Sequence, residues 1–212
     1  MATAKTPLKK PDYWETAKRA LVRSDPVLGH IIKRYKGKTL VSRGSAFFSL
    51  ARAIAGQQIS VKAAESIWKK LEAGLGGEVS PATVMAAEAP LLRACGLSGQ
   101  KVVYLKELSQ FFTARKRHTW HRKSDEDITE DLISIKGIGK WSAEMFLIFH
   151  LMRPDIFPVG DLGLRKAIEK HYNKGEKLPL PEIRAIAEAW KPYRTVATWY
   201  LWRSLDPVPV EY

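Results

Sequence analysis

The sequence predicts an all-α fold, and two observations carry this prediction. Apolar residues recur at intervals of three and four over most of the chain, which is the spacing of one face of an α-helix. Alternation of apolar and polar residues, the pattern of a β-strand, is confined to residues 39–42 and is too short to predict one. The 212 residues suffice for one domain or for two subdomains that share a core.

Capping residues and helix-breaking residues set the bounds of the helices in the first half of the chain. Ser60 and Ser80 are placed to cap the helices that follow them. Pro81 suits a first helical turn, and Gly96 suits a helix end. Residues 1–12 are basic and contain proline, so we expect a mobile arm there. Helices are expected over residues 13–22, 45–55, 61–71, 81–87, 90–95 and 101–112.

The second half of the chain continues the helical pattern with short connections. Asp127 is placed to cap the first helix of this half. A long apolar helix follows a pair of glycines, and three amphipathic segments follow it. Helices are expected over residues 128–135, 140–151, 161–171, 181–190 and 192–202.

The chain carries a large excess of basic residues. Lys and Arg total 35 against 22 Asp and Glu, a formal net charge of +13, which favours polyanions such as DNA or RNA as partners. Cys95 is the only cysteine, which excludes an intrachain disulfide, an iron–sulfur cluster and a Cys-rich zinc site. We see no secretory signal at the N-terminus and no apolar run long enough to span a bilayer. We therefore expect an intracellular protein, in the cytoplasm or nucleoid, that does not contact membranes.

Residues 135–140, Ile-Lys-Gly-Ile-Gly-Lys, form a turn between two of the expected helices. Glycines tolerate positive φ and let a ligand approach the backbone closely. The second helix begins here, so its free N–H groups and positive dipole end point out of the turn, and the flanking lysines suit a phosphate. The alternative is an ordinary helix–glycine–helix connection. The combination favours binding of a DNA phosphate, and the residues expected to contact it are Gly137, Ile138, Gly139 and Lys140.

This pattern resembles the helix-hairpin-helix DNA glycosylases of the HhH-GPD superfamily, and among them the 3-methyladenine DNA glycosylase II branch, which repairs alkylation damage. The turn followed by a Pro-x-x-Asp run is more specific than the turn alone. The resemblance extends over roughly residues 13–205. Three more segments are similar to parts of that branch: residues 48–60 to its minor-groove segment, 96–105 to its second DNA-facing turn, and 190–203 to its C-terminal helix.

The resemblance also implies an architecture. It predicts an all-α fold of two helical subdomains around a DNA-binding cleft, with the helix-hairpin-helix motif at about residues 128–151. The central subdomain would comprise residues 42–152. The second would combine residues 13–41 with 153–212.

Asp161 ends a Pro-Val-Gly-Asp run, and the resemblance places it at the family's catalytic aspartate. Cleavage of an N-glycosidic bond builds positive charge on the deoxyribose, which a nearby carboxylate stabilises. The carboxylate can also orient or deprotonate the attacking water, and the target nucleotide must first flip out of the stack. The local pattern alone indicates an N-cap for the following helix. Both interpretations can hold, because a cap fixes the carboxylate in place.

Trp141 stands where bifunctional members of the superfamily carry a lysine, immediately after the Gly-x-Gly-Arg/Lys segment. That lysine forms a Schiff base with the sugar and permits strand cleavage. The resemblance therefore implies a monofunctional glycosylase that uses water. Its products would be an abasic site and a free base.

Aromatic residues are expected to form the base pocket. Trp202 matches a base-pocket tryptophan of the alkylation branch, and Trp141 begins the helix beside the hairpin. Alkylated purines such as 3-methyladenine and 7-methylguanine carry positive charge, which electron-rich rings attract. Met145, one turn after Trp141, completes the expected pocket at a position where some relatives have an aromatic residue. Core packing is the alternative for any single tryptophan, and it is our interpretation of Trp68 and Trp190.

Polar residues at helix junctions supply the other expected DNA contacts. Gln57 and Gln58 interrupt two apolar helices, and their side chains can enter the minor groove and fill the gap left by the flipped base. The alternative is a helix–helix turn with solvated amides. Ser60 belongs to the same segment, and Ser98 and Lys101 are expected at phosphate, with an ordinary helix start as their alternative.

We predict no catalytic metal and no required cofactor, because the histidines show no ligand spacing with a third donor. In the family that the chain resembles, hairpin carbonyls can hold a monovalent cation, Na⁺ or K⁺, that bridges to phosphate. Ile133, Ile135 and Ile138 match those positions. The basic run at residues 115–118 could touch the DNA backbone, but we interpret it as solvated surface.

The sequence thus predicts a monofunctional DNA glycosylase that hydrolyses the N-glycosidic bond of alkylated purines in damaged double-stranded DNA, as a monomer in base excision repair. Two alternatives stay open. A glycosylase for uracil, thymine mismatches or deaminated purines would keep Asp161 but need hydrogen-bond donors in its pocket. A non-catalytic hairpin module would need neither Asp161 nor the paired Trp141 and Trp202.

Overall fold

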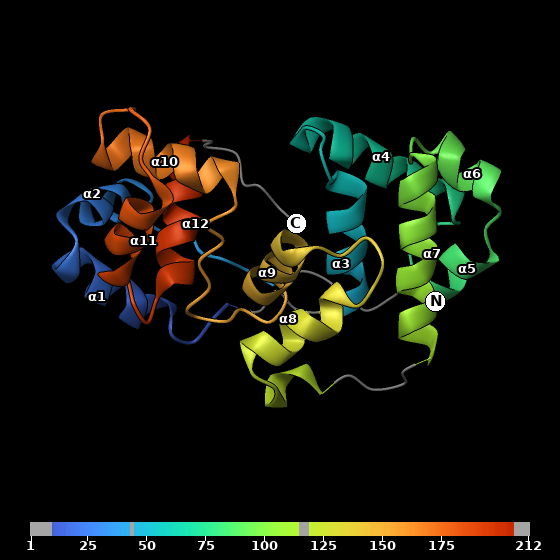
Figure 1. Cartoon of the computed structure of the whole chain (residues 1–212). Coiled ribbons are helices and arrows are strands. Elements are labelled where there is room, and N and C mark those ends of the chain that lie inside the picture. The colour runs from blue at the N-terminus through green and yellow to red at the C-terminus, as the bar shows by residue number, and fades with distance from the viewer. Residues whose placement is uncertain (1–9, 43–44, 115–118, 206–212) are drawn as a thin grey trace. The chain divides into compact units, whose positions relative to one another are not determined.

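The structure, a computed structural model, describes residues 10–42, 45–114 and 119–205. Over these residues the chain forms α-helices, one short 3-10 helix and no β-strand, which confirms the predicted all-α fold (Figure 1). The elements in chain order are α1 (Trp14–Ser24), α2 (Pro26–Arg34), α3 (Ala46–Gly56), α4 (Val61–Gly74), α5 (Pro81–Ala86), α6 (Ala89–Ala94), α7 (Gly99–Ala114), η1 (Trp120–Arg122), α8 (Asp125–Ile133), α9 (Lys140–Phe149), α10 (Leu162–Tyr172), α11 (Leu180–Glu188) and α12 (Arg194–Leu205).

The described residues fall into two compact units. The terminal unit consists of residues 10–42 and 147–205, so both ends of the chain contribute to it. The central unit consists of residues 45–146 apart from the undescribed segment. Helix α9 begins in the central unit and ends in the terminal one. The predicted bounds of the two subdomains, 42–152 and 13–41 with 153–212, stay predictions.

The terminal unit is built around large aromatic side chains. The blue α1 and α2 lie beside the orange and red α10, α11 and α12 in Figure 1, and α12 packs against α1, α2 and α10. Trp14, Trp190 and Tyr200 are completely buried. Trp14 meets Trp199 edge to face with ring centroids 5.3 Å apart. Burial of these rings supplies much of the apolar contact that joins the two ends of the chain.

Helix α2 is absent from the helices expected from the sequence, although its start signals are present. Asp25 is the N-cap, its Oδ1 accepts from the Leu28 backbone N–H at 3.0 Å, and Pro26 occupies the first turn. The carboxylate is buried, and its Oδ2 also accepts from the Tyr172 hydroxyl at 2.6 Å and from Trp190 Nε1 at 2.8 Å. One cap residue therefore ties α2 to the C-terminal part of the chain.

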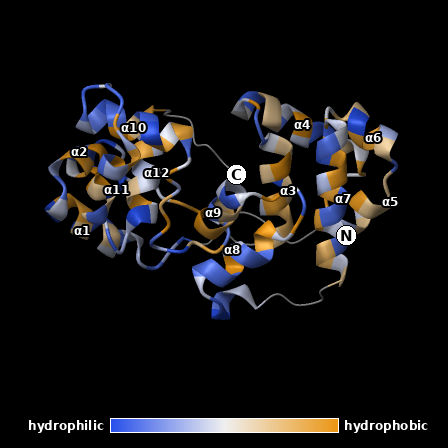
Figure 2. Cartoon of the chain, viewed as in Figure 1, coloured by the Kyte–Doolittle hydropathy of each residue, from blue (hydrophilic) through white to orange (hydrophobic). Residues whose placement is uncertain are grey.

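The central unit packs α3 against α4 and α7, and α7 against α5 and α6. Hydrophobic and hydrophilic residues are interspersed along its helices, as the orange and blue segments in Figure 2 show. Phe112 contacts Phe47 and Trp120 edge to face, with centroids 5.5 and 5.8 Å apart, and Trp120 contacts Phe146 at 4.9 Å. This aromatic cluster connects α3 and α7 to α9, the helix that follows the glycine turn.

The structure corrects the predicted cap of α8, and it describes only part of the predicted arm and none of the basic run. The cap of α8 is Ser124, whose Oγ accepts from the Asp127 backbone N–H at 3.0 Å, so the prediction that Asp127 caps this helix was wrong. Asp127 lies instead in the first turn with two other acids, where the helix dipole favours negative charge. Of the expected arm, residues 1–9 lie outside the described residues, whereas Pro11 is buried and accepts from the Trp14 N–H. The basic run at residues 115–118 also lies outside them.

Candidate functional site

The glycine turn joins α8 to α9 and rests on two buried isoleucines. Ile135 and Ile138 are 5% and 4% exposed, and the Ile138 N–H donates to the Ile135 carbonyl at 3.0 Å. Lys136 and Lys140 are exposed on either side. The two isoleucines therefore support the turn. The ammonium groups of Lys136 and Lys140 and the N–H groups at the start of α9 are open to an anion.

Gly137 has no room for a side chain. Its φ is 92°, a conformation that favours glycine. A Cβ atom at this position would also overlap the ring of Tyr104 on α7. The hydroxyl of Tyr104 accepts a hydrogen bond from Gln100 Nε2 at 2.5 Å, one turn earlier on the same helix. Tyr104 therefore lies directly behind the turn and sets how close α7 comes to it.

A polar pocket of about 410 Å³ lies beside the turn in the central unit. Three segments that are distant in sequence border it: the connection between α3 and α4, the start of α7, and the hairpin. The structure thereby brings together most of the predicted DNA-binding residues. The lining residues are Gln57, Gln58, Ser98, Gln100, Lys101, Tyr104, Gly137, Ile138 and Gly139.

The two glutamines at this pocket differ in role. Gln57 is half-buried, and its Nε2 donates to the Gly137 carbonyl at 2.9 Å, across 80 residues of sequence. Gln58 is exposed and has a φ of 58°, which is uncommon for a residue other than glycine. The sequence suggested the same minor-groove role for both. In the structure the Gln58 side chain is exposed at the turn, whereas the Gln57 amide donates to the hairpin carbonyl.

The remaining predicted contacts are helix-start residues. Ser60 is the N-cap of α4, and its Oγ accepts from the Ala63 N–H at 3.2 Å. Ser98 accepts from the Lys101 N–H at 3.3 Å. The ammonium group of Lys101 donates to the Ala55 carbonyl at 2.8 Å, and partial burial lowers the pKa of this lysine. Lys101 thus ties α7 to the end of α3, and its contact with phosphate stays a prediction.

Asp161 lies in the terminal unit as the N-cap of α10. Its Oδ1 accepts from the Leu164 backbone N–H at 2.7 Å and from Trp202 Nε1 at 2.8 Å. The carboxylate is half-buried, and the backbone N–H of Asp161 donates to the Pro158 carbonyl at 2.8 Å. Cap geometry and an aromatic donor thus define the orientation of the acid, as the cap interpretation required.

The loop before Asp161 is fastened to the start of α12, the helix that carries Trp202. Arg194 forms an ion pair with Asp155, with Nε 2.7 Å from Oδ1 and Nη2 2.9 Å from Oδ2. The Thr195 hydroxyl donates to the Arg153 carbonyl at 2.6 Å and accepts from the Ile156 N–H at 3.0 Å. A paired guanidinium and a buried threonine therefore place the acid-bearing loop relative to α12.

Trp202 is held on its other side by a second aromatic ring. Phe149 at the end of α9 stacks on it with centroids 5.8 Å apart and an interplanar angle of 11°. Gly163 is the close neighbour that the sequence analysis missed: a Cβ there would lie 3.2 Å from Asp161 Oδ1 and 3.6 Å from Trp202 Cδ1. A glycine two residues after the acid was the only available signal.

Trp141 and Met145 lie one turn apart on α9 in the central unit. Trp141 is half-buried, whereas Met145 is 2% exposed. That they form one base pocket with Trp202 stays a prediction. The core-packing interpretation is confirmed for Trp68 and Trp190, which are 2% and 0% exposed.

No group of three or more His, Cys, Asp or Glu residues in the described part of the chain is arranged to hold a metal ion. None of the helices described there combines the length and the apolar character needed to cross a membrane. The predicted monovalent cation would use main-chain oxygens instead. Ile135 already accepts one hydrogen bond there, but a carbonyl oxygen has a second lone pair, so its use by the turn does not exclude a cation.

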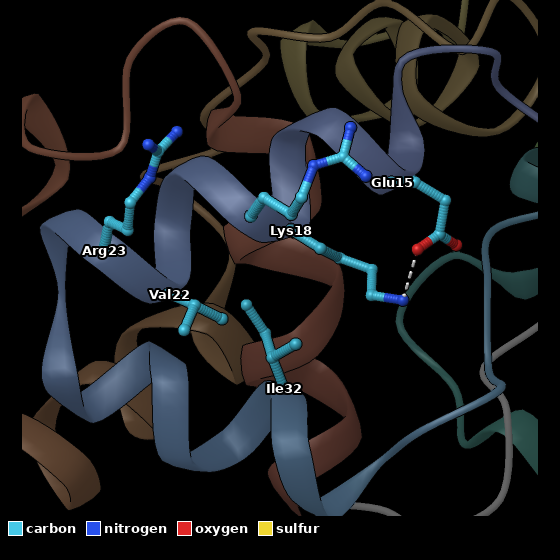
Figure 3. Close-up of a pocket in the computed structure, with 6 residues that line it drawn as sticks. Glu15, Lys18, Val22, Arg23 and Ile32 are labelled. Carbon is cyan, nitrogen blue, oxygen red and sulfur yellow. Dashed lines mark hydrogen bonds and ion pairs between the residues drawn. The ribbon is translucent and has the colours of Figure 1, made fainter.

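A second groove, of about 610 Å³, lies on α1 and α2 and is separate from every predicted site residue (Figure 3). Val22 and Ile32 form its apolar part, and Arg23 lies at its edge. Glu15 accepts from the Lys18 ammonium at 2.8 Å, the dashed contact in Figure 3. Lys10 also donates to Glu15, and these two cations lower the pKa of that carboxyl to about 2.

Comparisons with known proteins identify the family of this chain. Residues 51–192 match the model of the HhH-GPD superfamily base excision DNA repair proteins. The chain is 31% identical over 180 residues to DNA-3-methyladenine glycosylase 1 of Schizosaccharomyces pombe, an alignment that covers 82% of this chain and 78% of that protein.

Solved structures give the same result. The crystal structure of a DNA-3-methyladenine glycosidase from Bacillus halodurans superposes with a TM-score of 0.78 at 30% identity, covering 95% of this chain and 93% of that one. The Schizosaccharomyces pombe 3-methyladenine DNA glycosylase in complex with abasic DNA gives a TM-score of 0.79 at 28% identity, covering 89% and 96%.

Proposed function

Since this chain belongs to the HhH-GPD superfamily of base excision DNA repair proteins, we propose that it is a DNA glycosylase that releases alkylated purines from double-stranded DNA. The relatives named 3-methyladenine DNA glycosylase support the substrate class. The observation that carries the proposal is Asp161, whose carboxylate is oriented by the Leu164 N–H and the Trp202 indole. A module that only binds phosphate does not require a carboxylate oriented in this way.

The proposed reaction begins with DNA binding at the hairpin. The hairpin holds the DNA backbone, and the damaged nucleotide flips out so that its glycosidic bond can reach the acid. The N-glycosidic bond breaks with its electron pair going to the purine, which leaves as a neutral base because alkylation had made it cationic. Asp161 stabilises the positive charge on the sugar, and water adds to C1′ and gives up a proton to the carboxylate or to solvent.

The proposed enzyme is monofunctional. Trp141 occupies the position of the Schiff-base lysine of bifunctional relatives, and Lys140 belongs to the phosphate-binding turn. The products are an abasic site and a free base, without strand cleavage. Borohydride treatment during the reaction traps a Schiff base between enzyme and DNA, so we expect no trapped complex here, whereas a trapped complex would show lyase chemistry.

The base pocket in this proposal consists of Trp141, Trp202 and Met145. Electron-rich rings attract a cationic purine, and such a base leaves without being protonated. The half-buried Trp141 and the stacked Trp202 suit this role. We further propose that the protein acts as a monomer inside the cell. The carbonyls of Ile133, Ile135 and Ile138 would hold a Na⁺ or K⁺ ion, which would supply positive charge to the hairpin.

Base release from a set of duplexes tests the proposed function. Duplexes carrying 3-methyladenine or 7-methylguanine are compared with otherwise identical duplexes carrying uracil, a thymine mismatch or hypoxanthine. Release of the methylpurines alone supports the proposal. Release of uracil, thymine or hypoxanthine instead would show a glycosylase of different specificity, and binding without release from any duplex would show a non-catalytic module.

A further inference from the structure

Two loops that are predicted to touch DNA lie side by side in the central unit, and protein contacts hold them together. The first is the connection between α3 and α4, here called the glutamine turn, residues 57–60. The second is the hairpin, residues 134–139. Both border the same pocket. Their spacing matters, because a phosphate grip and a side chain that fills the duplex must meet the same DNA at once.

A single side chain spans the two loops. Gln57 Nε2 donates to the Gly137 carbonyl at 2.9 Å in a partly buried contact. The carbonyl that it holds belongs to the glycine whose φ of 92° gives the hairpin its shape. An amide is well suited to this contact, since it supplies an N–H donor without bringing a charge close to the DNA.

The same glycine also lies against helix α7. Tyr104 lies against Gly137, where even a Cβ atom would overlap its ring. Lys101, one turn before Tyr104, donates from Nζ to the Ala55 carbonyl at 2.8 Å, near the end of α3. Helix α7 thus contacts both the hairpin and the helix that leads into the glutamine turn. Gln57 completes a closed set of contacts between them.

Hydrogen bonds hold the glutamine turn at both ends, and the residue Gln58 between them is exposed. Gln57 is bonded at one end, and Ser60 caps α4 at the other. Between them Gln58 has a φ of 58° and is exposed. Strained backbone conformations persist where surrounding structure holds them, and they concentrate at functional sites. The contacts of Gln57 are therefore well placed to maintain the conformation that presents Gln58.

We propose that Gln57 is a positioning residue that fixes the hairpin relative to the glutamine turn and thereby presents Gln58, the residue expected at the minor groove. The proposal rests on the proposed function for its consequence in base release. It assigns different roles to two adjacent glutamines because their contacts differ. Gln57 acts on the DNA through the Gly137 carbonyl, and Gln58 acts on it directly.

Two matched variants test whether the two glutamines have different roles. They are measured first in the free protein and then in the base-release reaction. Gln57→Glu keeps the size of the side chain but removes the donor to Gly137. Gln58→Glu makes the same change at the exposed neighbour. Hydrogen exchange of the hairpin amides, measured without DNA, should be about fivefold faster or more in Gln57→Glu and unchanged in Gln58→Glu, as expected for loss of one intramolecular hydrogen bond. Equal exchange in wild type and Gln57→Glu would overturn the proposal.

Acidification gives a second readout. Below about pH 4 to 5 the introduced carboxyl of Gln57→Glu is protonated and can again donate to the carbonyl. Protection factors of the hairpin amides should then return toward the wild-type values, relative to wild type at the same pH. A loss of protection that does not recover on acidification would show a disturbed fold and contradict a hydrogen-bonding role.

Base release tests whether the hydrogen bond from Gln57 to Gly137 matters for the reaction. Single-turnover release should fall about fivefold to tenfold in Gln57→Glu even at saturating DNA, because the hairpin is less well placed. Gln58→Glu should reduce release and DNA affinity with hairpin protection intact. If wild-type protein releases no base, the proposed function fails while the exchange result still decides the role of Gln57. If Gln58→Glu speeds exchange as Gln57→Glu does, the assignment of different roles is wrong.

Discussion

The indole Nε1 of Trp202 donates a hydrogen bond to Asp161 Oδ1 at 2.8 Å. The sequence suggested that Trp202 is a surface for stacking of the damaged base, and its ring does lie parallel to that of Phe149. The hydrogen bond adds a second role. The same side chain helps to hold the acid, so we expect changes at Trp202 to affect the proposed reaction as well as the proposed base pocket.

Trp202→Phe separates these two roles, since it keeps an aromatic ring but removes the N–H donor. We expect single-turnover release of methylpurines to fall about 10- to 100-fold, the usual weight of a hydrogen bond to a charged group. Affinity for undamaged DNA should not change. Trp68→Phe is the matched control, because it removes an indole donor to Glu72 in the other unit. Equal rates in Trp202→Phe and wild type would mean that the hydrogen bond has no part in the reaction.

Gly163→Ala tests how closely Asp161 is fitted to its surroundings. The added methyl would lie 3.2 Å from Asp161 Oδ1, so the carboxylate must shift by a few tenths of an ångström. Release should fall about 3- to 10-fold, while the midpoint of thermal unfolding changes little because alanine favours a helix. Gly29→Ala in α2 is the control, since its Cβ has only ordinary contacts with Val22. Unimpaired release in Gly163→Ala would show that the carboxylate tolerates displacement.

Gly137→Ala should disrupt the hairpin. It combines a strained φ of 92° with overlap on Tyr104, and we expect a loss of at least about 2 kcal/mol in the free energy of unfolding together with weaker DNA binding. Urea denaturation and titration with abasic DNA measure these effects. Gly139→Ala has open space and should leave stability within about 1 kcal/mol of wild type. Similar stability in the two variants would contradict the packing described for Tyr104.

We expect His150 to make folding sensitive to acid. Burial lowers the pKa of its imidazole to about 4, below the ordinary value of 6.5. The unfolded chain therefore binds a proton at a higher pH than the folded protein does, so the contribution is complete above about pH 6.5 and is lost as the pH falls toward 4. In His150→Gln the decline in unfolding free energy between pH 7 and 4 should be smaller by about 3 kcal/mol. Parallel curves for the two proteins would exclude this origin.

Helix boundaries could be predicted where caps, glycines and apolar spacing agreed. The Ser60 and Ser80 caps and the start of α9 after the glycine turn are examples. Helix α2 was missed although Asp25-Pro26 is a start signal, because its apolar residues follow closely on those of α1. Ser124 was passed over as the cap of α8 because three acids follow it, and any of them has a side chain that can cap.

The candidate site could be predicted only in part. A phosphate-binding turn and a capping acid are local features, so the pattern around Gly137 and Asp161 pointed to both. The hydrogen bonds from Gln57 to Gly137 and from Trp202 to Asp161 join residues 80 and 41 positions apart. No local pattern reports such contacts, since they depend on how helices pack. The distinction between Gln57 and Gln58 has the same origin.

The most direct test of the account is methylpurine release by Asp161→Asn. Asparagine is as good an N-cap as aspartate, and its side-chain oxygen can still accept from the Leu164 N–H and the Trp202 indole, so the fold should persist. Only the charge is lost. We predict release at least about 1,000-fold slower than wild type, with thermal stability and affinity for abasic DNA retained. Release at the wild-type rate by Asp161→Asn would contradict the assignment of Asp161 as the catalytic acid.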